Sequence, residues 1–230
     1  MEKYFYLLWA SIFLGFWMIL FLRRKDTRKE MLTISALFGL GGLAAQKTNI
    51  QDWWQPLTIT GTSIGIEDFL IGFSIGGIAA VIYEEIYRRR LRKGVGGTLA
   101  PSDPGFFLLL FPLLYLILFF LLELGSFYSV VVACLASIGF MLFSRRDLRR
   151  DSLMSGVIML AIGSGVYFLL FLIKPDYIQQ FWYLPDHWYA QLLFGVPIGE
   201  YIWFFLIGAY IGPLYEYLKR LRLVRERKQK

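Results

Sequence analysis

Three carboxylates stand at the starts of two long apolar segments and are candidates for proton transfer. Glu67 and Asp68 open the segment that follows Gly65, and Glu200 opens the segment that follows Pro197. A carboxyl group in apolar surroundings can act as a general acid or base. A carboxylate beside the positive end of a helix dipole also stabilises any helix start, so a purely structural role is an alternative for each of the three.

The two segments are copies of each other. GIEDFLIGFSIGGIAAVIYEEIY and PIGEYIWFFLIGAYIGPLYEYLK align at a constant offset of 132, which pairs Asp68 with Glu200 and Glu84 with Glu216. The similarity continues outside them, in RRKDTRKEML and RRDLRRDSLM, and in WWQP and WYLP at an offset of 129. An internal repeat of this length predicts that the chain contains two related structural units.

Aromatic residues gather near the same ends of the two segments. Each copy has one directly after its last carboxylate, Phe69 and Tyr201, and the loops before them contain Trp53, Trp54, Trp182, Tyr183 and Trp188. Tryptophan and tyrosine at membrane interfaces commonly form an aromatic belt. Aromatic faces also stabilise cations. Phe69, Tyr201, Trp53, Trp54, Trp182 and Tyr183 are therefore the candidate substrate-binding residues, and the belt is the alternative.

The composition indicates an integral membrane protein. Of the 230 residues 57% are hydrophobic and the mean hydropathy is +0.55, more apolar surface than a soluble core of this size can bury. We expect seven spans, at residues 4–22, 31–46, 66–87, 105–123, 126–144, 152–173 and 196–218. Most are close to the roughly 20 residues that cross a bilayer.

The basic residues predict the orientation of these spans. The links after the first, third and fifth spans and the C-terminal tail contain 21 of the 24 lysines and arginines. Because cytoplasmic loops are enriched in lysine and arginine, the N-terminus is predicted to be outside and the C-terminus cytoplasmic. We read the net charge of +7 as this topology signal and expect no nucleic-acid partner.

Together these patterns predict an all-α protein, a seven-transmembrane helix bundle of 3+1+3 architecture. Residues 1–230 form a single membrane domain, in which 1–93 and 126–222 are three-helix repeats and 105–123 is a connector helix. The repeats have the same orientation and are related by a pseudo-twofold axis along the membrane normal. The interface between them is the natural place for a site.

Three further glutamates, Glu84, Glu85 and Glu216, lie near the cytoplasmic ends of the repeated segments. Each has an arginine four residues later, at positions 88, 89 and 220, so we expect ion pairs on the helix surface. The spacing of small residues, Gly72 to Gly76 and Gly208 to Gly212, predicts close helix packing.

The sequence lacks the motifs that are typical of several function classes. There is no GxGxxG after a strand and no cluster of histidine and cysteine, so we expect no cofactor and no metal. The only cysteine, Cys134, lies in an apolar run and is predicted to be a buried packing residue.

The doubled unit of about 110 residues resembles the membrane-integral lycopene cyclase domain, found as heterodimeric bacterial subunits and as fused archaeal and fungal forms. In that family a Pro-Ile/Leu-Glu-Glu/Asp-aromatic signature opens the third helix of each unit. Here it stands as Gly65-Ile66-Glu67-Asp68-Phe69 and Pro197-Ile198-Gly199-Glu200-Tyr201. Gly65 replaces the first proline, and Gly199 replaces the first carboxylate of the second copy.

The resemblance implies a redox-neutral cyclisation of lycopene to β-ionone rings without a cofactor. It assigns Glu67, Asp68 and Glu200 as catalytic residues, and it implies a hydrophobic isoprenoid or carotenoid substrate within the bilayer, among lipids. The oligomeric state stays open, because the heterodimeric relatives place between two chains the interface that this chain makes internally. The alternatives are a carotenoid-binding scaffold without activity, which the Gly199 departure keeps open, and a small-solute transporter of 3+1+3 topology.

Overall fold

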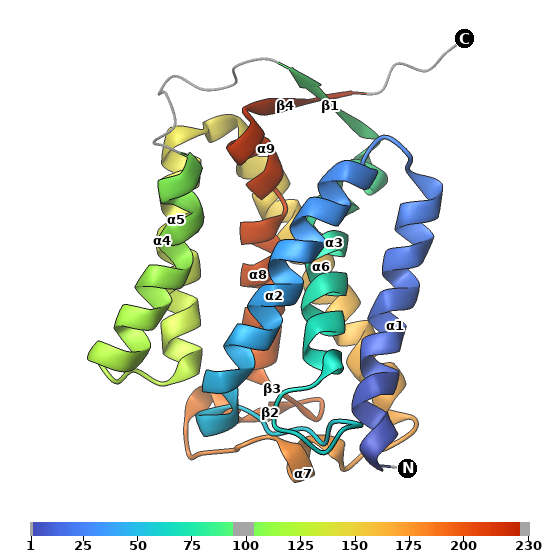
Figure 1. Ribbon diagram of the computed structural model, residues 1–230, viewed down its shortest axis with the longest axis vertical. Helices are drawn as coiled ribbons and strands as arrows, with labels where there is room; N and C mark the ends of the chain where they lie inside the picture. Colours follow the sequence, from blue (N-terminus) through green and yellow to red (C-terminus); the bar gives the residue numbers. More distant parts are fainter. Residues whose placement is uncertain (1, 94–103, 226–230) are drawn as a thin grey trace.

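The structure is a computed structural model that describes residues 2–93 and 104–225, so the basic residues Arg227, Lys228 and Lys230 of the tail lie outside it. Its α-helices are α1 (Glu2–Arg23), α2 (Arg28–Asp52), α3 (Ile66–Tyr87), α4 (Pro104–Leu116), α5 (Ser126–Ser144), α6 (Arg149–Phe171), α7 (Tyr177–Phe181), α8 (Ile198–Ile211) and α9 (Leu214–Lys219) (Figure 1). The π-helix η1 (Ile117–Leu121) extends α4, and the 3-10 helices are η2 (Arg146–Leu148) and η3 (Trp188–Ala190). The strands are β1 (Arg89–Lys93), β2 (Leu192–Leu193), β3 (Val196–Pro197) and β4 (Leu221–Arg225).

The all-α class is confirmed, with two short two-stranded sheets added at opposite ends of the bundle. Each of the seven predicted spans falls on a helix, and the last is divided at Pro213 into α8 and α9. Within the described residues, five helical stretches are long and apolar enough to cross a membrane, at 3–23, 66–87, 126–144, 146–171 and 198–219. The chain is therefore a multi-pass membrane protein, while the 3+1+3 arrangement stays a prediction.

Helix α2 is longer than its apolar run. The predicted span ended at residue 46, whereas the helix continues to Asp52. Hydropathy detects only the apolar part of a helix, and the polar residues from Gln46 to Asp52 complete the last turns without adding to that signal. The extra turns bring Trp53 and Trp54 to the end of the bundle where α7 and the β2/β3 hairpin lie (Figure 1).

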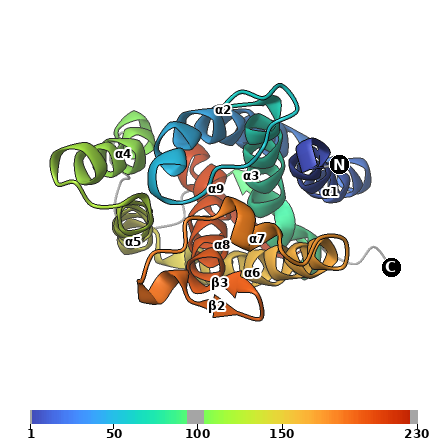
Figure 2. The ribbon, with the colours of Figure 1, turned by 90° about the horizontal axis from the view of Figure 1, so that it is seen from below.

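Glycines allow the central helices to approach closely. A Cβ atom on Gly72 of α3 would lie 2.3 Å from the carbonyl oxygen of Phe38 on α2. A Cβ atom on Gly208 of α8 would lie 2.7 Å from the carbonyl oxygen of Ser155 on α6. The predicted small-residue packing is confirmed at both places, and it produces two tightly packed helix pairs, α2 with α3 and α6 with α8. In Figures 1 and 2, α1 lies on one side of these pairs and α4 and α5 on the other.

Two arginines hold the basic end of the bundle together, and they make matching bonds. Arg24 donates to both carboxylate oxygens of Asp26 at 2.9 Å, and Arg145 does the same with Asp147 at 2.9 and 2.8 Å. The Arg24 guanidinium holds the pKa of Asp26 below its usual value, because it donates to the ionised carboxylate.

Each arginine also donates to one carbonyl group in the last turn of a helix and to one just beyond that helix. Arg24 reaches the carbonyl oxygens of Glu84 and Arg89, at 3.0 and 2.8 Å. Arg145 reaches those of Glu216 and Leu221, at 3.5 and 2.7 Å. The carbonyl oxygens of Glu84 and Glu216 also accept the backbone N–H groups of Arg88 and Arg220, so the arginine side chains add a second donor at each helix end. The strands that follow, β1 and β4, pair antiparallel.

The predicted ion pairs of Glu84, Glu85 and Glu216 are wrong. Both helices end in left-handed residues, Arg88 with φ 50° and Arg220 with φ 53°, so neither arginine continues the helical spacing on which such pairs depend. Glu84 and Glu216 are fully buried and none of their carboxylate oxygens has a hydrogen-bond partner among the described residues. Glu85 instead contacts Arg23 of α1 at 3.0 Å.

The contact between α2 and α3 predicts that Gly72→Ala destabilises the protein by about 1–3 kcal/mol, because the methyl group must displace the backbone of α2. Gly15→Ala in α1 is the matched control, since a Cβ atom there has no neighbour within 4 Å. The control should be neutral or gain up to about 1 kcal/mol of helix propensity. Thermal unfolding in detergent compares the two, and equal midpoints would contradict the packing argument.

Candidate active site

A cavity of about 580 Å³ lies between α2, α3, α4, α5 and α8. Its walls are mostly aromatic and aliphatic, and its volume is within the range of about 300–1,000 Å³ typical of ligand pockets. The lining includes Leu37 of α2 and Leu116 of α4, which are 42% and 45% exposed, so the cavity reaches the outer face of the bundle between these helices. Figure 2 shows α4 and α5 standing beside α2 and α8 on this side.

Asp68 lines this cavity and accepts hydrogen bonds on both of its oxygens. It is the third residue of α3, where Oδ2 accepts the backbone N–H of Gly65, the residue before the helix, at 2.7 Å. Oδ1 accepts the Tyr6 hydroxyl of α1 at 2.5 Å. Each oxygen of Asp68 thus accepts one hydrogen bond from within the protein.

Glu200 lines the same cavity with a different set of partners. Its Oε1 accepts two indole N–H groups, from Trp53 at 2.7 Å and from Trp182 at 2.9 Å, and neither of these bonds falls on Oε2. The buried Tyr167 also interacts electrostatically with this carboxylate. The residue that would cap it, Pro197, has no backbone N–H to give. Because the first copy has Gly65 at this place and the second has Pro197, the two equivalent carboxylates are held differently.

A series of aromatic ring contacts connects the two carboxylates. The Tyr6 ring meets Trp54 edge-on at 4.8 Å, and Trp54 meets Trp182 at 4.8 Å between ring centroids. Residues 54 and 182 also form a β-bridge, so the two loops are joined through their backbones. Trp54 and Trp182 are only 8% and 7% exposed, so these two indoles belong to the core and not to an interfacial belt.

Four of the predicted site residues lie outside the cavity lining. Glu67 is fully buried behind it, and its Oε1 accepts the N–H of Ile59 at 2.7 Å, which holds the loop before α3. Phe69 packs against Phe73, while Tyr183 and Tyr201 donate to the carbonyl oxygens of Ile50 and Leu193. The structure therefore brings together Asp68, Glu200, Trp53, Trp54 and Trp182.

Gly199, where the second signature lacks its carboxylate, makes room for an indole. A Cβ atom at this position would lie 2.8 Å from the ring of Trp53 and 3.1 Å from that of Phe127. Because Trp53 donates to Glu200, any larger residue at 199 would displace a donor of the remaining carboxylate. The departure at Gly199 is thus coupled to how Glu200 is held.

The sequence analysis missed Tyr6 and Trp9 of α1, both of which line the cavity. Their rings are 1% and 5% exposed, and Tyr6 is the residue that bonds Asp68. The available signal was weak, a polar hydroxyl near the N-terminal end of an apolar span. Nothing in its spacing indicates that α1 packs against the start of α3.

The fold and the cavity define a multi-pass helical membrane protein with an aromatic, carboxylate-containing pocket inside the bundle. A family model described as lycopene cyclase matches residues 3–86 and 125–218, which include the two repeated segments. The match covers more than half of the chain, so this chain belongs to the lycopene cyclase family. Neither the comparison with curated proteins nor that with solved structures found a match.

The bond between Tyr6 and Asp68 predicts the effect of Tyr6→Phe. The variant leaves Oδ1 without its donor in a buried place and should lower the free energy of unfolding by about 1–3 kcal/mol. Tyr4→Phe is the matched control, because Tyr4 is on the same helix and 62% exposed. Thermal unfolding in detergent measures both, and a midpoint for Tyr6→Phe equal to that of the control would contradict the bond.

Proposed function

We propose that this protein cyclises the acyclic ends of lycopene or a related linear carotenoid to β-ionone rings, by redox-neutral acid–base chemistry. The observation that carries the proposal is the presence of Asp68 and Glu200 in one apolar, aromatic cavity that reaches the outside of the bundle. A long hydrocarbon substrate can enter from the bilayer between α2 and α4. Its end would then lie beside both carboxylates.

The hydrogen bonds suggest which carboxylate donates the proton. Both bonds to Glu200 fall on Oε1, so Oε2 can hold a proton and present it to the terminal double bond. Asp68 accepts bonds on both oxygens, an arrangement that suits a carboxylate that stays ionised. We therefore assign Glu200 as the acid and Asp68 as the group that stabilises the cation and accepts the proton.

The reaction balances without an oxidant or reductant. The proton from Glu200 adds to the terminal carbon–carbon double bond and leaves a tertiary carbocation. The next double bond attacks this cation and closes a six-membered ring, which moves the positive charge onto the ring. Loss of a ring proton to Asp68 then forms the ring double bond, so one proton enters and one leaves for each ring.

The walls of the cavity suit a carbocation. The indoles of Trp53, Trp54 and Trp182 surround the carboxylates, and aromatic faces attract positive charge most strongly where water is excluded. Exclusion of water also prevents its addition to the cation. In this scheme Glu67 is a positioning residue, because it holds the loop before α3 and does not line the cavity.

The basic residues support an orientation for this membrane protein. Arg24, Arg145 and the β1/β4 pair lie at the end opposite the cavity carboxylates. By the positive-inside rule we place this end at the cytoplasm, with the start of α1 and the carboxylates toward the outer face.

Expression of the full chain in a bacterium that accumulates lycopene tests the function. Chromatography and absorption of the extracted pigments should show monocyclic or bicyclic products. Unchanged lycopene, with the protein present in the membrane, would contradict the proposal. Pigment that copurifies with the protein would then indicate a binding scaffold, and its absence would favour the transporter alternative.

Substitution of the cavity carboxylates tests the assigned roles. Glu200→Gln and Asp68→Asn should each lower turnover by at least about 100-fold while the protein still inserts in the membrane. Glu123→Gln is the control, because this exposed glutamate lies in the turn between η1 and α5 and should keep full activity. A Glu200→Gln variant that cyclises lycopene at the wild-type rate would show that Glu200 is not the acid.

Cyclisation in D₂O tests the source of the proton. Because the acid exchanges with solvent, each ring should carry one deuterium that does not wash out, at the carbon protonated in the first step. Mass spectrometry of the pigment counts the added mass. Rings without deuterium would contradict protonation by an exchangeable carboxyl group.

A further inference from the structure

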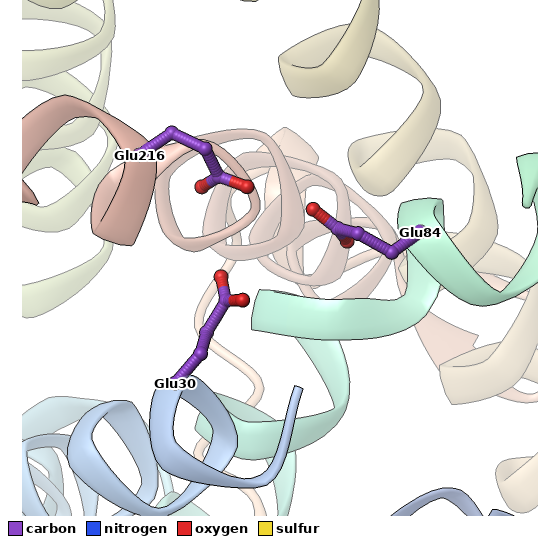
Figure 3. Close-up of side chains that lie close together, drawn as sticks. All are labelled: Glu30, Glu84 and Glu216. Atoms are coloured by element: carbon purple, nitrogen blue, oxygen red, sulfur yellow. The ribbon is translucent and has the colours of Figure 1, made fainter. Parts of the chain in front are cut away.

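Three glutamates meet inside the bundle at the end opposite the cavity. Glu30 of α2, Glu84 of α3 and Glu216 of α9 point toward one another (Figure 3), and one oxygen from each lies within 4.8 Å of the others. Their exposed fractions are 1%, 0% and 0%. None of their six oxygens has a hydrogen-bond partner among the described residues. We call these three residues the inner acid cluster.

Carboxylates that are buried inside the bundle without hydrogen-bond partners need another group that compensates their charge. Burial removes the solvation of each charge, and like charges at this distance repel strongly in an apolar interior. The cavity carboxylates satisfy this need with hydroxyl, indole and backbone donors, and the inner acid cluster has none of these. A cation between the oxygens would satisfy it directly.

The neighbouring arginines bond to the backbone of the cluster. Arg24 donates to the carbonyl oxygen of Glu84 at 3.0 Å, and Arg145 donates to that of Glu216 at 3.5 Å. Arg24 also donates to Asp26 on the surface, and Arg145 donates to Asp147. These bonds fix where the two glutamates stand while leaving the hydrogen-bonding sites of their carboxylates open.

A fourth acid stands beside the cluster. Asp151 of α6 is 2% exposed, interacts electrostatically with Glu84, and has one oxygen without a partner. Its other oxygen accepts the Ser155 hydroxyl at 3.1 Å. Asp151 lies 121 residues after Glu30, and Arg145 lies the same 121 residues after Arg24. Glu216 lies 132 residues after Glu84. Each half of the chain therefore contributes two acids from corresponding places.

We propose that Glu30, Glu84 and Glu216, with Asp151 beside them, bind a divalent cation. Oxygen ligands of this kind suit Mg²⁺, Ca²⁺ and Mn²⁺. This proposal differs from the expectation of no metal that we drew from the sequence. The ligands of this site are far apart in the chain, so they form no motif that the sequence reveals. Glu84 is 16 residues beyond Asp68 on α3, roughly 24 Å along the helix, so the cation does not reach the cavity. It joins α2 and α3 to α9.

The binding test uses the full chain purified in detergent, stripped with EDTA, and Mn²⁺ as the probe. Electron paramagnetic resonance should detect saturable binding of Mn²⁺, with competition by Mg²⁺ or Ca²⁺. Glu84→Gln should weaken this binding at least about tenfold, because it removes a charged ligand. Glu85→Gln is the matched control on the next residue of α3, whose carboxylate contacts Arg23. Binding that is absent, or equal in both variants, would overturn the proposal.

A stability measurement on the wild type decides the same question, whether or not a variant folds. Chelation should lower the unfolding temperature of the wild type, and added Mn²⁺ should restore it. Glu84→Gln should be insensitive to the chelator. A wild type that is equally insensitive would mean that protons neutralise the inner acid cluster, and the proposal would fail. Neither readout depends on carotenoid turnover, so failure here leaves the proposed function standing.

Discussion

The cost of placing carboxylates inside an apolar helix bundle governs both ends of this protein. Such groups persist only where donors or cations compensate them. At the cavity end, Tyr6, Trp53 and Trp182 supply hydrogen bonds to Asp68 and Glu200. At the opposite end the described residues supply none to Glu30, Glu84 and Glu216. The same requirement therefore produces a donor-lined pocket on one side and a candidate cation site on the other.

The two carboxylates in the cavity are held differently in the two copies of the repeat. Asp68 and Glu200 occupy equivalent positions, yet Gly65 offers a backbone N–H to one and Pro197 offers none to the other. Glu200 instead accepts the indoles of two loops, one from each half, and Gly199 leaves the space that Trp53 requires. In the proposed reaction, this difference of one backbone donor separates Glu200, the proposed acid, from Asp68, the proposed proton acceptor.

In the proposed reaction, the tightly packed part of the bundle holds the carboxylates in place and the open part admits the substrate. Close backbone contacts at Gly72 and Gly208, together with the arginine side chains that bond helix-end carbonyls at the basic end, fix the central helices around both carboxylates. Helices α4 and α5 stand to one side, and the cavity reaches the surface there beside exposed leucines. This arrangement suits a substrate that arrives through the bilayer and reacts at a fixed end.

The sequence by itself determined the membrane class, the helical segments, the doubled signature and the family, because hydropathy, charge asymmetry and repeats are read from residues close in the chain. It also placed Asp68 and Glu200 at corresponding helix starts. Only the tertiary structure decided that Tyr6 bonds Asp68, that Trp53 crosses to Glu200, and that Glu30 meets Glu84. The predicted ion pairs were wrong because the helices end at left-handed arginines, which helical spacing does not reveal. Partners of a buried side chain are chosen by how helices pack, and packing depends on residues far apart in sequence.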